Sequence, residues 1–171
     1  MTPLRICYND VAKAATTITA STEATGYGGS NVVHIHLSRA WRTTSAAAQW
    51  VKFDAGAGKT LQFDTACIIG HNLTAAAVIS VQTSTGDSWA PPDTASKNGD
   101  PTQSLIIVDM GGTTNVRWAR VYIDDASNPA GYVQVGRVFL CMRTELETID
   151  RGFSIGVEDS SVVTRSLTGQ V

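Results

Sequence analysis

The chain contains three histidines, and two of them have a spacing that metal sites use. His34 and His36 lie two residues apart in the apolar run 32–37, and His71 is the third histidine. Residues two apart in a strand point to the same face, so this pair could join a third ligand around a metal ion. His71 follows a different apolar run, and nothing in the sequence brings it to the pair. We therefore expect packing or surface histidines, with no metal and no cofactor.

Residues 57–60, Ala-Gly-Lys-Thr, are similar to the end of a phosphate-binding loop. In that motif backbone N–H groups and a lysine hold the phosphate at the start of a helix. The first glycine of the motif would fall at Phe53, and residues 61–63 alternate as a strand does. The segment is therefore interpreted as a turn between two strands.

The sequence contains no signature of a catalytic site. No serine lies in a Gly-x-Ser-x-Gly frame, and no cysteine has the local motif of a nucleophile. Carboxylates occur along the chain, but no motif pairs two of them across a cleft, as the hydrolysis of a glycoside requires. We expect a protein that is not an enzyme.

Aromatic residues are the best candidates for ligand binding. Sugar-binding modules stack sugar rings on exposed tryptophan or tyrosine beside polar groups. Trp50 and Trp118 lie inside strand patterns, and we expect both in the core because a tryptophan buries a large apolar area. The polar segment 23–31 contains no recognisable calcium loop. The candidates for contact with a glycan lie in predicted loops and are Tyr27, Trp41, Arg42 and Trp89.

The three cysteines are Cys7, Cys67 and Cys141. Their number is odd and their spacing is wide, which does not indicate a disulfide framework. Cys67 and Cys141 lie in apolar runs, where a free cysteine behaves as a small hydrophobic residue. We therefore expect buried thiols.

Composition and charge exclude several classes of partner. The formal net charge is −2, charged residues make up 16% of the chain, and no cluster of lysine and arginine occurs. A nucleic-acid-binding protein needs a basic surface that neutralises phosphates, so we expect no nucleic-acid partner. No window of about 18 apolar residues could span a bilayer, and no opening apolar stretch is typical of a signal peptide, so we expect no membrane association. The low charge suits a surface partly covered by neighbouring subunits.

Short apolar or alternating runs, separated by turn residues, recur along the 171 residues. This pattern, with almost no helical periodicity, is typical of an antiparallel sandwich, and we predict an all-β jelly roll. Residues 74–77 are the only candidate for a short helix, and residues 84–103 are expected to form a long irregular connection. One short strand is expected within the first dozen residues, and the others cover residues 32–37, 49–54, 61–70, 77–83, 104–109, 118–123 and 132–140.

The last two predicted strands flank a connection, residues 124–131, that contains Asp, Asn, Pro and Gly. These residue types favour reversal of the chain. We therefore expect residues 118–123 and 132–140 to pair as an antiparallel ribbon.

The apolar content of the chain falls after Met142. We predict one domain over residues 1–142 and a C-terminal arm over residues 143–171, because the arm has too few large apolar residues for a second core. The arm is expected to pack on a neighbouring subunit. Its apolar contact residues are Leu146, Ile149, Phe153, Ile155 and Leu167.

Four segments occur in an order found in a known family: QWVKFDAG at 49–56, IIGHNL at 68–73, WARVYI at 118–123 and VGRVFL at 135–140. Together they resemble the strands of discoidin-like, galactose-binding-like jelly rolls. The combination of GHNL with VGRVFL is most similar to structural proteins of tailed bacteriophages and prophages. Residues 150–153 and 158–165 resemble the segment that follows the jelly roll in those proteins. The resemblance covers about residues 15–165 and departs at Cys141, where such proteins often carry glycine.

The resemblance implies a structural component of a tailed phage particle, in the tail, tail tip or baseplate. Such a virion protein would assemble in the host cytoplasm through contacts with other virion proteins and with copies of itself. One alternative is a carbohydrate-binding module that contacts host surface glycans through the loops around Tyr27, Trp41 and Trp89. Further alternatives are a head-associated decoration or fibre-anchoring protein and an enzyme that acts on cell-envelope sugars.

Overall fold

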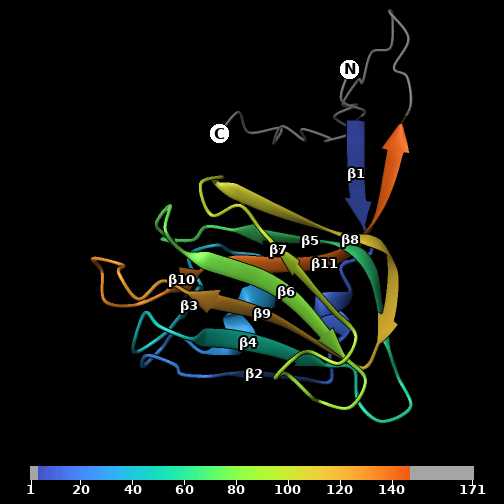
Figure 1. Ribbon diagram of the computed structural model, residues 1–171, viewed down its shortest axis with the longest axis horizontal. Coiled ribbons are helices and arrows are strands. Elements are labelled where there is room, and N and C mark those ends of the chain that lie inside the picture. The colour runs from blue at the N-terminus through green and yellow to red at the C-terminus, as the bar shows by residue number, and fades with distance from the viewer. Residues whose placement is uncertain (1–3, 147–171) are drawn as a thin grey trace, which may run out of the picture.

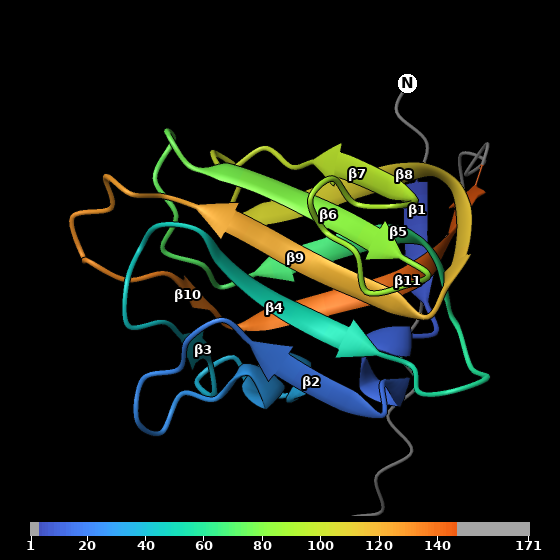
Figure 2. The same ribbon diagram turned by 60° about the horizontal axis from the view of Figure 1, so that its bottom comes forward.

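Two antiparallel β-sheets face each other in the computed structural model of the chain, which describes residues 4–146 (Figure 1, Figure 2). One sheet has the strand order β2-β4-β9-β6-β7 and the other β1-β11-β5-β8, while β10 and β3 form a separate pair. The prediction of an all-β jelly-roll sandwich is confirmed. The strands are β1 (Leu4–Tyr8), β2 (Thr17–Ala20), β3 (Trp41–Arg42), β4 (Gln49–Asp54), β5 (Leu61–Ile69), β6 (Val78–Ser84), β7 (Ala95–Asn98), β8 (Leu105–Val116), β9 (Trp118–Asp124), β10 (Gln134–Val135) and β11 (Arg137–Leu146).

Two short 3₁₀ helices accompany the strands, η1 (Val11–Ala14) and η2 (Gly29–Val33). Neither these nor any other helix in the described part of the chain is long and apolar enough to cross a membrane.

The core lies between the two sheets and follows the two-residue period of the strands. In β4 and β9 every second residue is buried, so that Val51, Phe53 and Val121 point inward. Residues of β5 and β11, including Ile68 and Leu140, form the opposite wall. Burial of a large apolar side chain contributes roughly 1.5–3 kcal/mol, so this alternation is the main source of stability.

β11 changes its neighbour along its length. Residues 137–141 pair with β5, whereas residues 142–146 pair with β1. The second half of β11 and β1 extend beyond the sandwich as a two-stranded ribbon (Figure 1). The domain boundary expected after Met142 therefore falls inside a strand, which also includes Leu146. The other expected arm residues, Ile149, Phe153, Ile155 and Leu167, lie outside the described residues.

β9 and β11 do not pair, so the expected antiparallel ribbon of residues 118–123 and 132–140 is wrong. β9 lies between β4 and β6 in the five-stranded sheet, and β11 lies in the other sheet. The connection between them crosses from one sheet to the other at one end of the sandwich (Figure 2).

Asp125 explains why this connection does not form a local hairpin. Its buried carboxylate accepts hydrogen bonds from the backbone N–H of Thr74 at 2.9 Å, the hydroxyl of Thr74 at 2.5 Å and the amide of Asn128 at 2.8 Å. The same Asn128 amide donates to the carbonyl of Asn72 at 3.0 Å. A buried polar group needs such partners, and here Thr74 of the loop after β5 supplies two of the three hydrogen bonds.

Three shorter segments also differ from the prediction. Residues 32–37 are not a strand, because η2 occupies their beginning and a loop follows. Residues 74–77 form a turn closed by a hydrogen bond from the N–H of Ala77 to the carbonyl of Thr74 at 3.1 Å. The connection 84–103 contains β7, which pairs with β6.

Replacing Asp125 with alanine leaves the donors of Thr74 and Asn128 without their acceptor in a buried place. We expect the free energy of unfolding to fall by about 2–4 kcal/mol, as measured by urea denaturation. Asp124→Ala is the matched control, because the bond of Asp124 to the N–H of Ala48 at 3.3 Å is exposed. The control should lose less than about 1 kcal/mol. Equal losses in the two variants would contradict the proposed role of Asp125.

Candidate functional site

Four side chains meet where β3 and β10 pair, at one end of the sandwich (Figure 1). Arg42 and Gln134 are cross-strand partners, and Nε and Nη2 of Arg42 donate to Oε1 of Gln134 at 3.0 and 2.6 Å. The guanidinium carbon of Arg42 lies 4.2 Å from the centre of the Tyr27 ring and 4.5 Å from that of the Tyr132 ring. Both are cation–π distances. We call these four residues the Arg42 cluster.

Backbone hydrogen bonds hold Tyr27 against β3. The N–H of Arg42 donates to the carbonyl of Tyr27 at 3.1 Å, and the N–H of Ala24 donates to the carbonyl of Arg42 at 2.8 Å. Gly26 has a φ of +83°, a left-handed conformation that glycine adopts without steric cost. The loop before β3 therefore turns back tightly and places the Tyr27 ring against Arg42.

Asn72 holds the other half of the Arg42 cluster. Its Oδ1 accepts from the N–H of Gln134 at 2.7 Å, and its Nδ2 donates to the carbonyl of Tyr132 at 3.0 Å. The backbone N–H of Asn72 also donates to the carbonyl of Gln134 at 3.3 Å. One amide side chain from the loop after β5 thus fixes the segment that carries both Tyr132 and Gln134.

Of the four sequence candidates, Tyr27 and Arg42 are brought together, whereas Trp41 lies behind them. Trp41 is fully buried, and its Nε1–H donates to the carbonyl of Thr22 at 2.9 Å. Successive residues of a strand point to opposite faces, so Trp41 points into the core while the half-buried Arg42 points away from it. The expectation that Trp41 contacts a glycan is therefore wrong.

Trp89 lies in the loop after β6, which begins at the end of β6 that is farther from β3 and β10 (Figure 2). Its ring lies 4.4 Å from the guanidinium carbon of Arg120, and its Nε1–H donates to Asp87 at 2.5 Å. Trp89 is half-buried. It can contact a ligand only at a different surface from Tyr27 and Arg42.

Trp50 and Trp118 lie on the outer face of the five-stranded sheet, so their expected place in the core is wrong. Both are half-buried, whereas their strand neighbours Val51 and Ala119 are fully buried. Adjacent residues of a strand point to opposite faces. Val51 and Ala119 therefore point into the core, and the neighbouring indoles cover the outside of the sheet.

Cationic side chains lie between the aromatic rings of this outer face. Nζ of Lys52 is 4.7 Å from the centre of the Trp118 ring and 5.7 Å from that of Trp50. The guanidinium carbon of Arg120 is 5.5 Å from the centre of the Tyr122 ring. We call these five residues the aromatic face. Stacking with these cations packs the rings against the outside of the sheet.

An ion pair borders the aromatic face. Nε and Nη2 of Arg117 donate to the two carboxylate oxygens of Asp54 at 2.8 and 3.1 Å. Hydrogen bonding from Arg117 lowers the pKa of the Asp54 carboxyl below its usual value. The guanidinium of Arg117 also lies 4.6 Å from the centre of the Trp118 ring, so the pair fixes the edge of this face.

The histidines do not gather into a three-ligand site within residues 4–146. The rings of His34 and His36 lie 5.3 Å apart in the loop after η2, and the N–H of His36 donates to Nδ1 of His34. His71 instead lies 2.8 Å from the carbonyl of Gln103. Residues 57–60 connect β4 to β5, as expected for a turn between strands.

The cysteines form a group that the sequence did not indicate. Cys67 and Cys141 are buried, as expected, but Cys7 is exposed, so the expectation of buried thiols is wrong for Cys7. Across the part of the chain that the structure describes, these three cysteines are the only potential metal ligands that lie together in a group of three or more. The alternation of residues in β5 and β11 could have indicated that Cys67 and Cys141 point away from the core. The pairing of β1 with β11, which brings Cys7 to them, could not be predicted from the sequence.

No family model and no curated protein matches the sequence. Solved structures match at low sequence identity. The lectin domain of lectinolysin complexed with Lewis B antigen is similar with a TM-score of 0.62 and 15% identity, over 80% of this chain and 99% of that chain. The family 32 carbohydrate-binding module from C. perfringens NanJ, in complex with galactose, has a TM-score of 0.59 and 10% identity over 82% of this chain and 100% of that chain. The fold is a galactose-binding-like jelly roll.

The same jelly roll occurs within larger enzymes. A Ruminococcus gnavus GH29 fucosidase in complex with fucose is similar with a TM-score of 0.61 and 15% identity over 80% of this chain, which spans only 27% of the fucosidase chain. The discoidin-like part of the sequence resemblance is thus confirmed for the fold. None of these three structures is a virion protein.

Replacing Asp54 with asparagine should lower stability at neutral pH, because it weakens the bond to Arg117. The pKa of Asp54 is lowered in the folded protein, so its stabilising effect is present above the unfolded carboxyl pKa of about 3.9 and is lost as the pH falls through the folded value. The difference in melting temperature between wild type and Asp54→Asn should therefore be constant from neutral pH to about pH 5 and shrink below about pH 4. A difference that persists unchanged to about pH 2 would argue against this charge effect.

Proposed function

We propose that this domain binds carbohydrate and that the Arg42 cluster is its binding site. The observation that carries the proposal is the convergence of two tyrosine rings, a guanidinium and an amide at one end of the jelly roll. The fold supports it, because structures similar in fold were solved with galactose, fucose and Lewis B antigen.

The chemistry of the Arg42 cluster suits a sugar. The apolar C–H face of a sugar ring can stack on tyrosine, while hydroxyl groups need directed polar partners. The bonds of Arg42 to Gln134 use Nε and Nη2, and no other hydrogen bond of this guanidinium is made within residues 4–146. The hydrogens of Nη1 are therefore available for a hydroxyl or carboxylate oxygen of a ligand.

The Arg42 cluster is also organised before a ligand binds. Stacking on Tyr27 and Tyr132 and the bond to Gln134 restrict the long side chain of Arg42. Asn72 fixes the backbone of residues 132–134. A side chain ordered in advance loses less conformational entropy on binding, which raises affinity for a small ligand.

A glycan array with the full chain, followed by calorimetry on the best ligand, tests this function. Arg42→Ala should weaken binding by about 10-fold or more, because a hydrogen bond to a charged group contributes about 1.5–3 kcal/mol. Arg42→Lys should give an intermediate loss, because lysine keeps the charge but not the planar fork. Tyr27→Ala should weaken binding through loss of the stacking surface.

Trp89→Ala is the matched control, since Trp89 is an aromatic loop residue that packs on Arg120 and not on Arg42. It should leave the dissociation constant unchanged. Loss of binding in Trp89→Ala with normal binding in Arg42→Ala would move the site to the surface around Trp89 and Arg120. Failure to bind any glycan on the array would overturn the proposed function.

The virion role stays a prediction of the sequence. Nothing in the fold or in the comparisons supports a place in a phage particle, and most of the expected assembly arm lies outside the described residues. Partners other than glycans, including virion proteins and further copies of the chain, are likewise untested.

A further inference from the structure

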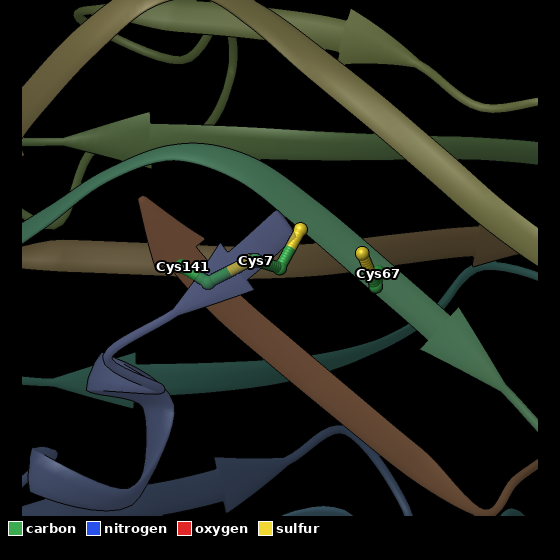
Figure 3. Close-up of side chains that lie close together, drawn as sticks. All are labelled: Cys7, Cys67 and Cys141. Carbon is green, nitrogen blue, oxygen red and sulfur yellow. The ribbon is translucent and has the colours of Figure 1, made fainter. Parts of the chain in front are cut away.

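Three strands bring the cysteines together on the outer face of the four-stranded sheet. Cys7 lies in β1, Cys67 in β5 and Cys141 in β11. Their sulfur atoms all lie within 4.8 Å of one another (Figure 3). Cys67 and Cys141 alternate with inward-pointing core residues, which places their thiols on the side away from the core. We call these three residues the thiol cluster.

The strand register disfavours a disulfide between Cys141 and either of the other two cysteines. Cys67 is paired with Phe139, and Cys141 with Thr65, so the two cysteines are diagonal neighbours. Diagonal Cα atoms in an antiparallel pair are about 7–8 Å apart, whereas a disulfide needs about 4.4–6.8 Å. Cys7 is paired with Arg143 and is therefore also diagonal to Cys141.

A metal ion relieves this restriction, because it bridges sulfur atoms that cannot bond directly. Zinc–sulfur bonds are about 2.3 Å long, so three thiolates on a tetrahedral ion have sulfur atoms about 3.8 Å apart. The sulfur atoms of the thiol cluster need to approach by at most about 1 Å to reach this spacing. Small changes of side-chain torsion suffice for such a shift, without movement of the strands.

We propose that the thiol cluster binds one thiophilic metal ion, of the Zn(II) or Cu(I) type, through the three cysteine sulfurs. Thiolates are the ligands that select these ions. Cys7 and Cys67 line a surface cavity of about 320 Å³, whose other lining residues include Ile69, Ile107 and Phe139. The cavity gives an ion a path of entry and leaves a fourth coordination position for water or a small ligand.

A cationic side chain lies beside the thiol cluster. Arg143 lines the same cavity and is held in place by an ion pair with Asp109 at 2.7 Å. Its cationic group offsets part of the charge of three thiolates around the ion. Binding of the ion displaces the thiol protons into solvent.

The full chain, reduced and freed of metal with a chelator, tests the proposal. Titration with Co(II) should give one equivalent per chain, with thiolate-to-metal charge-transfer absorption, and Zn(II) should displace the cobalt. Competition with a chromogenic Cu(I) chelator then shows whether Cu(I) binds more tightly. Saturating Zn(II) should raise the melting temperature, because the ion connects β1, β5 and β11.

Cys67→Ser should weaken Zn(II) binding by about 100-fold or more, since it removes one of three thiolates. Cys7→Ser is the variant least able to disturb folding, because Cys7 is exposed, and it should weaken binding by at least about 10-fold. The double variant His34→Ala/His36→Ala is the control for adventitious binding and should retain full affinity. Circular dichroism verifies that each variant is folded.

Three outcomes would overturn the proposal. The reduced protein could fail to bind any of the three ions stoichiometrically. Binding could survive unchanged in both Cys7→Ser and Cys67→Ser. The Co(II) complex could lack thiolate-to-metal charge-transfer absorption, which would place the bound ion away from the cysteines.

Discussion

Each strand of this sandwich has two faces, and only one of them can be buried between the sheets. The two-residue period therefore decides the environment of every side chain once the strand is placed. In β9, Val121 and Ile123 enter the core, while Arg120 and Tyr122 cover the outside. The same constraint separates Trp41 from Arg42 in β3 and directs Cys67 away from the core in β5. The candidate site and the thiol cluster are thus both consequences of the alternation that builds the core.

Much of the fold was predictable because this alternation is local. The pattern at residues 49–54 defined β4 with its correct bounds, and residues 61–70 and 77–83 came within one residue of β5 and β6. Pairing was less predictable, because it depends on residues far apart in the sequence. The turn residues before β10 suggested a hairpin, but Asp125 and Asn128 instead bond to the loop after β5.

The candidate site was predictable only in part, because it too depends on long-range pairing. Tyr27 and Arg42 could be recognised as an aromatic residue and a polar residue in a loop. Their partners Tyr132 and Gln134 could not, because only the pairing of β3 with β10 brings them to Arg42. Trp50 and Trp118 were predicted to be in the core because a tryptophan side chain is large and apolar. The space between the sheets is limited, and the smaller neighbours Val51 and Ala119 fill it instead.

The two-stranded ribbon of β1 and β11 has a consequence for how this domain can be joined to other polypeptide. Leu4 and Leu146, the first and last described residues, are direct cross-strand partners. Their Cα atoms are therefore separated by only about 5 Å, the usual spacing of an antiparallel pair. Residues 4–146 could accordingly be inserted into a surface loop of an unrelated protein without forcing the two sides of that loop apart. The ribbon would then act as a short stalk, with the Arg42 cluster held away from the point of attachment.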